Sequence, residues 1–361
     1  MKHETQYNHR SSPSSWYNGC HYSPIMKALR HENNKQVPIW LMRQAGRYLA
    51  EYRALREKVS FLELCKTPRL AAEVMQATVE KLGVDAAIIF SDILLLLQPL
   101  GFDLEYTEDK GPVIHNPIRS TDDLARVQDR INLGELEYVF DTVETTRSML
   151  DPLKPLIGFA GGPFTLAAYA IEGGYSRDFV RTKAFMRSYP AVWQELLSRL
   201  GRAATHYLRA QIEAGAQVVQ VFDTWAGCLS VSDYERYVLT PTKRLAESVV
   251  RHAPLIYFST GNPALCESFA LLDCDAISVD WRIEIGNAWR RIGYDRAIQG
   301  NMDPSILLTN ESVIRREAQR ILESVGKQPG FIFNLGHGIH KDTPLENVMT
   351  LIQTVHEFDP S

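Results

Sequence analysis

Short apolar runs alternate with longer amphipathic stretches along most of the chain. Eight of these runs are continuously apolar and are bounded by polar or turn residues. That pattern is typical of strands buried on both faces of a parallel sheet. We expect strands at Pro38–Met42, Ala86–Phe90, Pro155–Phe159, Val218–Phe222, Leu255–Ser259, Ala276–Val279, Arg296–Gln299 and Phe331–Leu335.

The stretches between these runs have helical periodicity. Pro68–Leu82 repeats apolar residues every three or four positions, and Pro190–Ala214 and Asp233–His252 behave in the same way. Thr309–Val325 also carries a start signal, because Asn310 can cap its first turn. Strands that alternate with helices predict parallel βαβ units.

Eight such units predict an α/β protein with one domain. We expect a closed (β/α)8 TIM barrel with an active-site cleft on its C-terminal face. The main rival is an open doubly wound sheet, which usually carries a glycine-rich phosphate loop after its first strand. Here the first predicted strand is followed by Arg43-Gln44-Ala45-Gly46, which is no such loop. We therefore predict one barrel domain from residue 24 to residue 361.

Residues 1–23 differ from the rest of the chain. They are rich in Ser, Asn, His and Tyr and show neither helical nor strand periodicity. They also lack the apolar core of a secretory signal. We expect a disordered N-terminal tail here.

Composition limits the cellular compartments and the kinds of partner that fit this protein. A net charge of −4 at pH 7 gives no globally basic surface for nucleic acid. The five cysteines are widely spread and form no CxxC pair, which favours free thiols in a reducing compartment. No apolar segment approaches the roughly 18 residues of a membrane span. We therefore expect a cytoplasmic protein that acts on a small-molecule substrate. We expect this protein to bind neither nucleic acid nor membrane.

The barrel prediction can be checked in the sequence, because functional side chains of such a barrel directly follow its strands. Arg43 and Gln44 follow the first predicted strand, Ser91-Asp92 the second, Asp223-Thr224 the fourth and Gly336-His337-Gly338 the last. Each of these alone could be a helix cap, a turn or a structural histidine. Their convergence on one rim predicts a polar, charged site.

Arg43 and Arg47 lie four positions apart around an Ala-Gly pair. If the chain turns into a helix here, both guanidiniums fall on one helix face and can reach the same anion. The alternative is a solvated helix face on which an arginine pairs with Glu51.

Several common chemistries lack their motifs. The chain contains no GxSxG, HExxH or GxxxxGKS/T sequence and no His-x-Cys pair. We therefore expect no bound metal, and a site that offers arginine cations, a carboxylate, a tyrosine hydroxyl and an imidazole.

Seven segments resemble the signatures of the uroporphyrinogen decarboxylase family. They occur in the family's order from about Pro38 to His337, and the general pattern continues to about Phe358. The segments are Arg43–Tyr48, Ile89–Ile93, Gly158–Pro163, Tyr169–Gly174, Asp280-Trp281, Gly300–Pro304 and Asn334–Gly338.

This resemblance implies a (β/α)8 barrel that works without metal or cofactor, generally as a homodimer. It implies a carboxy-lyase that removes carbon dioxide from the four acetate side chains of uroporphyrinogen III. The product would be coproporphyrinogen III, in haem and related tetrapyrrole biosynthesis.

The resemblance also implies the roles of the site residues. Asp92 would accept hydrogen bonds from the pyrrole N–H groups and stabilise the protonated ring. Arg43 and Tyr169 would be the other catalytic residues. Arg43 and Arg47 would bind substrate carboxylates as charge-assisted forks. Arg43 is a poor proton donor, because a guanidinium loses its proton only at very high pH. The complete substrate-binding set would be Arg43, Gln44, Arg47, Asp92, Tyr169, Thr224 and His337.

The chain departs from the family pattern at several positions. Thr224 stands where a serine is frequent, and the segment Phe258–Gly261 lacks a lysine that bacterial members frequently carry. The segment Leu94–Gln98 is unusually rich in leucine. None of these departures touches the two arginines or Asp92.

Two other functions remain open. One is a corrinoid-linked methyltransferase of the same superfamily, which would bind zinc through a His-x-Cys pair and a later cysteine. The matching positions here are Phe258, Thr260 and His337, so the expected ligands are missing. The other is a non-catalytic tetrapyrrole-binding protein that has kept the cleft.

Overall fold

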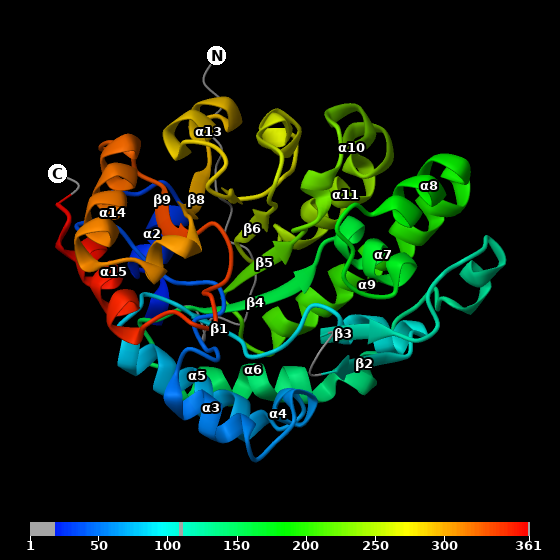
Figure 1. The fold of residues 1–361 in the computed structure, drawn as a ribbon, viewed down its shortest axis with the longest axis horizontal. Coiled ribbons are helices and arrows are strands. Elements are labelled where there is room, and N and C mark those ends of the chain that lie inside the picture. The colour runs from blue at the N-terminus through cyan, green and yellow to red at the C-terminus, as the bar shows by residue number, and fades with distance from the viewer. Residues whose placement is uncertain (1–18, 108–110, 360–361) are drawn as a thin grey trace.

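Seven parallel strands form one curled sheet at the centre of the fold, and helices lie around it (Figure 1). This computed structural model describes residues 19–107 and 111–359. The strands pair in the order β1 (Ala87–Ile88), β4 (Leu156–Gly161), β5 (Val218–Phe222), β6 (Leu255–Phe258), β7 (Ala276–Ser278), β8 (Ala297–Met302) and β9 (Phe331–Leu335).

The sheet confirms the parallel arrangement that the apolar runs predict. β4 and β9 are buried along their whole length, as expected for strands covered on both faces. The alternation of these strands with helices gives a TIM-like α/β fold.

The long helices follow the predicted periodicity. The segment Pro68–Leu82 is helical as predicted, and Asn310 caps the helix that begins at Glu311, accepting from the Val313 N–H at 3.1 Å. The helices are α2 (Pro24–Leu29), α3 (Ala50–Arg56), α4 (Phe61–Cys65), α5 (Pro68–Leu82), α6 (Glu137–Met149), α7 (Pro163–Glu172), α8 (Val180–Ser188), α9 (Pro190–Glu213), α10 (Val231–Tyr237), α11 (Leu239–Val249), α12 (Cys266–Phe269), α13 (Ile285–Ile292), α14 (Glu311–Val325) and α15 (Leu345–Glu357).

The predicted helix Asp233–His252 is wrong as a single element, because it divides into α10 and α11 at Val238. Pro241 lacks the N–H that would bond to the carbonyl of Tyr237, four residues earlier, in a continuous helix. That carbonyl instead accepts from the side chains of Trp193 and Gln194, each at 3.0 Å. The break therefore docks this region onto α9.

The predicted first strand, Pro38–Met42, forms only a single parallel bridge, between Ile39 and Phe333. Its backbone reaches both edge strands, because Phe333 N–H donates to the Pro38 carbonyl and Asp85 N–H donates to the Ile39 carbonyl, each at 2.8 Å. Side chains replace the remaining ladder bonds. The Asp85 carboxylate accepts from Ile39 N–H at 2.8 Å, and Asn334 Oδ1 accepts from Met42 N–H at 3.1 Å.

A buried polar network lies among the strands. Gln299 of β8 donates to Gln220 of β5 at 3.1 Å and to Ser278 of β7 at 2.9 Å. It also accepts from the Trp40 indole at 2.8 Å. The segment that contains Trp40 is thus fixed to strands from three other parts of the sheet.

The structure adds an antiparallel hairpin that the sequence pattern did not predict, β2 (Leu104–Thr107) and β3 (Gly111–Ile114). At the N-terminus, Cys20 is fully buried and Ser23 caps α2, so residues 19–23 pack on the fold although we assigned them to the tail. Residues 1–18 of the predicted tail lie outside the described residues.

All five cysteines are free, as predicted. Within residues 19–107 and 111–359, none of the helices is both long and apolar enough to cross a membrane.

Candidate active site

Arg43 lies in a turn at the end of the first predicted strand and has a backbone φ of +60°. This left-handed conformation is unfavourable for a residue with a Cβ and is typical of functional sites. The helix begins only at Ala50, so the prediction that Arg43 and Arg47 share a helix face is wrong. Glu51 pairs with Lys81 and not with Arg47.

Gln44 causes this turn. Its side-chain oxygen accepts from Leu41 N–H at 3.2 Å, and its amide nitrogen donates to the Ala86 carbonyl at 3.1 Å. The residue is completely buried. Both ends of the amide are used within the protein, which gives Gln44 a structural role and leaves it no surface for a substrate.

The Arg43 side chain crosses the backbone of Gly338. A methyl group on residue 338 would come within 2.6 Å of the Arg43 Cγ and 3.0 Å of its Nε. Only a glycine leaves room for the arginine at this point. Arg43 therefore lies beside His337, although the two residues are far apart in the sequence.

Asp92 follows β1, and its Oδ1 accepts from Leu94 N–H at 2.8 Å. Part of the residue is exposed, yet protein atoms surround the carboxyl group, and this desolvation raises the pKa of Asp92. The Leu94 N–H, the Tyr106 hydroxyl and the charge of Arg43 oppose that rise in pKa.

Tyr169 is carried by α7 and stacks on Trp225, with 3.9 Å between the ring centroids and 25° between the planes. Burial raises the pKa of Tyr169, and the nearby Asp92 carboxylate raises it further while Arg43 lowers it. The phenol therefore stays protonated and can donate a hydrogen bond.

Asp223 holds the start of α7 in place. Its Oδ1 accepts from both the N–H and the hydroxyl of Thr165 at 2.8 Å, and its Oδ2 accepts from Tyr257 at 3.1 Å. A methyl group at Gly162 would come within 2.7 Å of the Asp223 Oδ1. Asp223 is fully buried, so it supports the helix that carries Tyr169 rather than facing a ligand.

Thr224 is half-buried in the loop that brings Trp225 under Tyr169. Its carbonyl accepts from the Thr260 hydroxyl at 2.8 Å. The two threonines that depart from the family pattern thus contact each other and join the loops after β5 and β6.

His337 is neutral at physiological pH. Burial lowers its pKa to about 4, with the positive charge of Arg43 as the next cause. Its Nδ1 accepts from Gly338 N–H at 2.8 Å, so the neutral ring carries its proton on Nε2. His337 is therefore a hydrogen-bond donor and not a cation.

The structure brings Arg43, Asp92, Tyr169 and His337 together. Arg43 influences the pKa of each of the other three, and Asp92 that of Tyr169. Arg47 is exposed, and within the described part of the chain its guanidinium has no ion pair. Its carbonyl accepts from Arg53 at 2.8 Å.

Our sequence reasoning missed three residues of this site. Tyr106 comes from the unpredicted hairpin, and Trp225 stacks on Tyr169. Gly338 gives space to Arg43. Gly338 belongs to the Asn334–Gly338 motif, but nothing in the sequence indicates which side chain its missing Cβ accommodates.

Within the described ranges, no group of three or more His, Cys, Asp or Glu residues could hold a metal ion. The rings of Phe258 and His337 lie 6.5 Å apart, so an aromatic side chain occupies one position where the zinc-binding rival requires a ligand.

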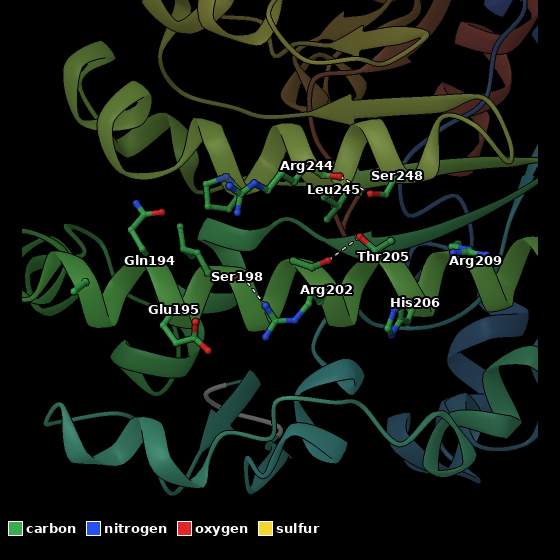
Figure 2. A pocket seen from close by; sticks show the side chains of 14 residues that line it. Gln194, Glu195, Ser198, Arg202, Thr205, His206, Arg209, Arg244, Leu245 and Ser248 are labelled. Carbon is green, nitrogen blue, oxygen red and sulfur yellow. Dashed lines mark hydrogen bonds between the residues drawn. The ribbon is translucent and has the colours of Figure 1, made fainter.

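A groove of about 500 Å³ lies between α9 and α11, lined by arginines and hydroxyl groups (Figure 2). None of the four clustered residues, Arg43, Asp92, Tyr169 and His337, lines it. We assign the candidate site to the cluster, because only there do a carboxylate, a cation and neutral donors converge.

Comparisons with known proteins agree with the motif order. A family model described as "Uroporphyrinogen decarboxylase (URO-D)" matches residues 21–358. A uroporphyrinogen decarboxylase of Carboxydothermus hydrogenoformans is 48% identical over 335 residues, covering 92% of this chain and 96% of the relative. One of Chloroflexus aurantiacus is 47% identical over 339 residues, covering 92% and 95%. A solved methyltransferase from Methanosarcina mazei has a TM-score of 0.75 at 22% identity, covering 93% of this chain and 99% of its own; this likeness shows the fold alone.

Proposed function

The chain belongs to the uroporphyrinogen decarboxylase family, and we propose that Asp92 and the residues around it decarboxylate uroporphyrinogen. The enzyme is a carboxy-lyase of tetrapyrrole biosynthesis. The observation that carries the site assignment is the position of the Asp92 carboxyl, which is poorly solvated yet surrounded by one cation and several neutral donors.

The reaction needs a place for the electrons that carbon dioxide leaves behind. In our proposal a proton first adds to a ring carbon beside an acetate side chain, which makes that pyrrole cationic. The bond between the methylene and the carboxylate then breaks, carbon dioxide leaves, and its electron pair neutralises the ring. A proton then adds at the methylene carbon, and the ring carbon releases the proton it took up, which restores the pyrrole and leaves a methyl group. Each acetate therefore consumes one net proton.

Asp92 suits the cationic step. A carboxylate in a poorly solvated site stabilises a developing positive charge more strongly than it would in water. The same carboxylate can accept hydrogen bonds from several of the inward-pointing pyrrole N–H groups and so hold the flexible ring in a domed shape. We assign Asp92 both functions.

The other residues bind the carboxylates of the substrate. Arg43 anchors one of them as a charge-assisted fork, and its left-handed turn aims the guanidinium across Gly338. Tyr169 and the neutral His337 donate single hydrogen bonds from either side. Thr224 and the exposed Arg47 extend this set toward the outer carboxylates. Arg43 acts as anchor rather than acid, because an arginine guanidinium keeps its proton in proteins.

We further propose that the fold is a closed barrel. The backbone hydrogen bonds of Pro38 to Phe333 and of Ile39 to Asp85 support an eighth strand position between β9 and β1. The proposed domain spans residues 24–361, with the site on its C-terminal face, and the chain acts as a cytoplasmic homodimer that needs no cofactor and yields coproporphyrinogen III.

An anaerobic incubation of the metal-stripped protein with uroporphyrinogen III tests this function. After oxidation, chromatography separates the products by their number of carboxylates. We expect hepta- to tetracarboxylate products without any added cofactor. Recovery of the octacarboxylate alone, after a binding measurement has shown that it binds, would make the chain a non-catalytic tetrapyrrole-binding protein. Activity that depends on added zinc would contradict the cofactor-free mechanism.

A further inference from the structure

Four hydroxyl groups in the cluster around Asp92 and Tyr106 are buried and make no hydrogen bond of normal length and angle within residues 19–107 and 111–359. They belong to Ser91, Tyr106, Tyr138 and Tyr207. A buried hydroxyl without a partner is unfavourable, and native proteins contain few of them. Four such groups beside a catalytic carboxylate therefore require an explanation.

Tyr106 is the member of this group whose hydroxyl approaches the Asp92 carboxylate as a donor, whereas Tyr207 interacts with Asp92 only through its charge. It lies on β2, and its ring packs against Phe61 with 5.0 Å between centroids. Phe61 in turn contacts Phe90 at 5.9 Å, two residues before Asp92 in the chain. The hairpin is thus fixed by aromatic contacts over the end of β1.

We propose that Tyr106 is a positioning residue for Asp92, whose carboxylate accepts a hydrogen bond from the Tyr106 hydroxyl and is thereby kept ionised and aimed at the substrate. This inference rests on the function proposed above. It gives the unpredicted hairpin a part in the reaction.

The physical need for such a donor follows from the surroundings of Asp92. Burial raises the pKa of Asp92, whereas stabilisation of a cationic ring requires the ionised form. A donor to the ionised form lowers the pKa again. Burial, and next the Asp92 charge, raise the pKa of Tyr106, so its phenol keeps the proton it must donate. Catalytic hydrogen bonds that are long in a free enzyme commonly shorten when substrate binds.

Besides Tyr106, four groups face Asp92. They are Arg43 from the first turn, Cys65 of α4, Tyr169 of α7 and Tyr207 of α9. Burial raises the pKa of Cys65, Tyr169 and Tyr207, so all three remain neutral across the working pH range. Loss of the Tyr106 hydroxyl is therefore not offset by another titration.

The test is the pH profile of kcat/KM in Tyr106→Phe. Without the hydroxyl donor the pKa of Asp92 rises, so a higher pH is needed to ionise it. We expect the acidic limb of the profile to move upward by about one pH unit. Tyr138→Phe is the matched control, because it removes another unpartnered buried hydroxyl of the same cluster that does not face Asp92. Its acidic limb should stay at the wild-type position.

An unchanged limb in Tyr106→Phe would overturn the proposal. Equal shifts in the two variants would also overturn it, because they would indicate a general effect on packing.

Infrared difference titration gives a readout that does not depend on turnover. The difference between the wild type and Asp92→Asn isolates the Asp92 carboxyl signal, and the same subtraction in a Tyr106→Phe background should give a higher midpoint pH. An equal midpoint would refute the role of Tyr106 even if the wild type proved inactive. The failure of this inference and of the proposed function can thus be told apart.

Discussion

Alanine at position 338 tests whether Arg43 must keep its place in the site. Gly338 has no side chain of its own to lose, and it is not among the glycines with positive φ, so its backbone tolerates alanine. The change also leaves every polar group of the site intact. Its only direct effect is the overlap of the new methyl group with the Arg43 side chain.

The size of the effect follows from that overlap. The methyl carbon would overlap most with the Arg43 Cδ and would lie 2.6 Å from its Cγ, whereas ordinary contact begins at 3.4 Å, so the arginine must move by about 1 Å. A misplacement of roughly 1 Å in a substrate-positioning group costs about 10²-fold in rate, or about 2.7 kcal/mol of transition-state stabilisation. The arginine can swing away, so we expect stability to fall by less than about 1 kcal/mol.

The assay compares kcat/KM and Tm for Gly338→Ala and Gly201→Ala. Gly201 lies within α9, and its added methyl would find nothing nearer than 3.8 Å, so alanine there should stabilise the helix by roughly 0.5–1 kcal/mol. We expect Gly338→Ala to lose about two orders of magnitude in kcat/KM and Gly201→Ala to lose none. Wild-type kcat/KM in Gly338→Ala would show that catalysis tolerates a displaced Arg43, and the position of this side chain would then have no part in the reaction.

Three further predictions follow from the site. Asp92→Asn should raise Tm at pH 7, because the raised pKa of Asp92 makes its ionised form destabilising above the pKa of the unfolded chain; a lower Tm at pH 7 would contradict this. His337→Asn should lower kcat/KM by about tenfold through the loss of one hydrogen bond, without changing the pH profile between pH 5.5 and 8, since the pKa of His337 is about 4. If the variant lost an ionisation that the wild-type profile shows near pH 6.5, His337 would not be neutral as described. Gly162→Ala should lower stability by about 1–3 kcal/mol by pushing on Asp223 at the start of α7, and an unchanged Tm would count against that support.

Periodicity predicted the elements whose stability comes from burial along one regular face. α5 and α14 are of this kind, and so are the fully buried strands β4 and β9. The apolar pattern fails to predict strand pairing where a side chain makes the hydrogen bond that a neighbouring strand's backbone would make. Asp85 and Asn334 do this beside Pro38–Met42, so that segment pairs through a single bridge.

The candidate site was predictable where a motif fixes chemistry and was not where three-dimensional contacts decide the role. The motifs pointed to Arg43, Asp92, Tyr169 and His337, which the fold brings together. Gln44 belongs to the same motif as Arg43, yet its side chain is fully used in shaping the turn.

Tyr106 shows the opposite case. Its hairpin is held over β1 by contacts with Phe61, which is distant in the sequence, so no local pattern could assign it to the site.

Matched time courses of the wild type and Asp92→Asn test whether Asp92 stabilises the cationic ring during decarboxylation. Both proteins would be incubated anaerobically with uroporphyrinogen III, their affinity for it measured separately, and the carboxylates of the products counted. We expect the wild type to form products with seven to four carboxylates, while Asp92→Asn stays folded and returns nearly all of the octacarboxylate. Comparable product formation by the two proteins would contradict this role of Asp92, because the reaction would then proceed without the negative charge of Asp92.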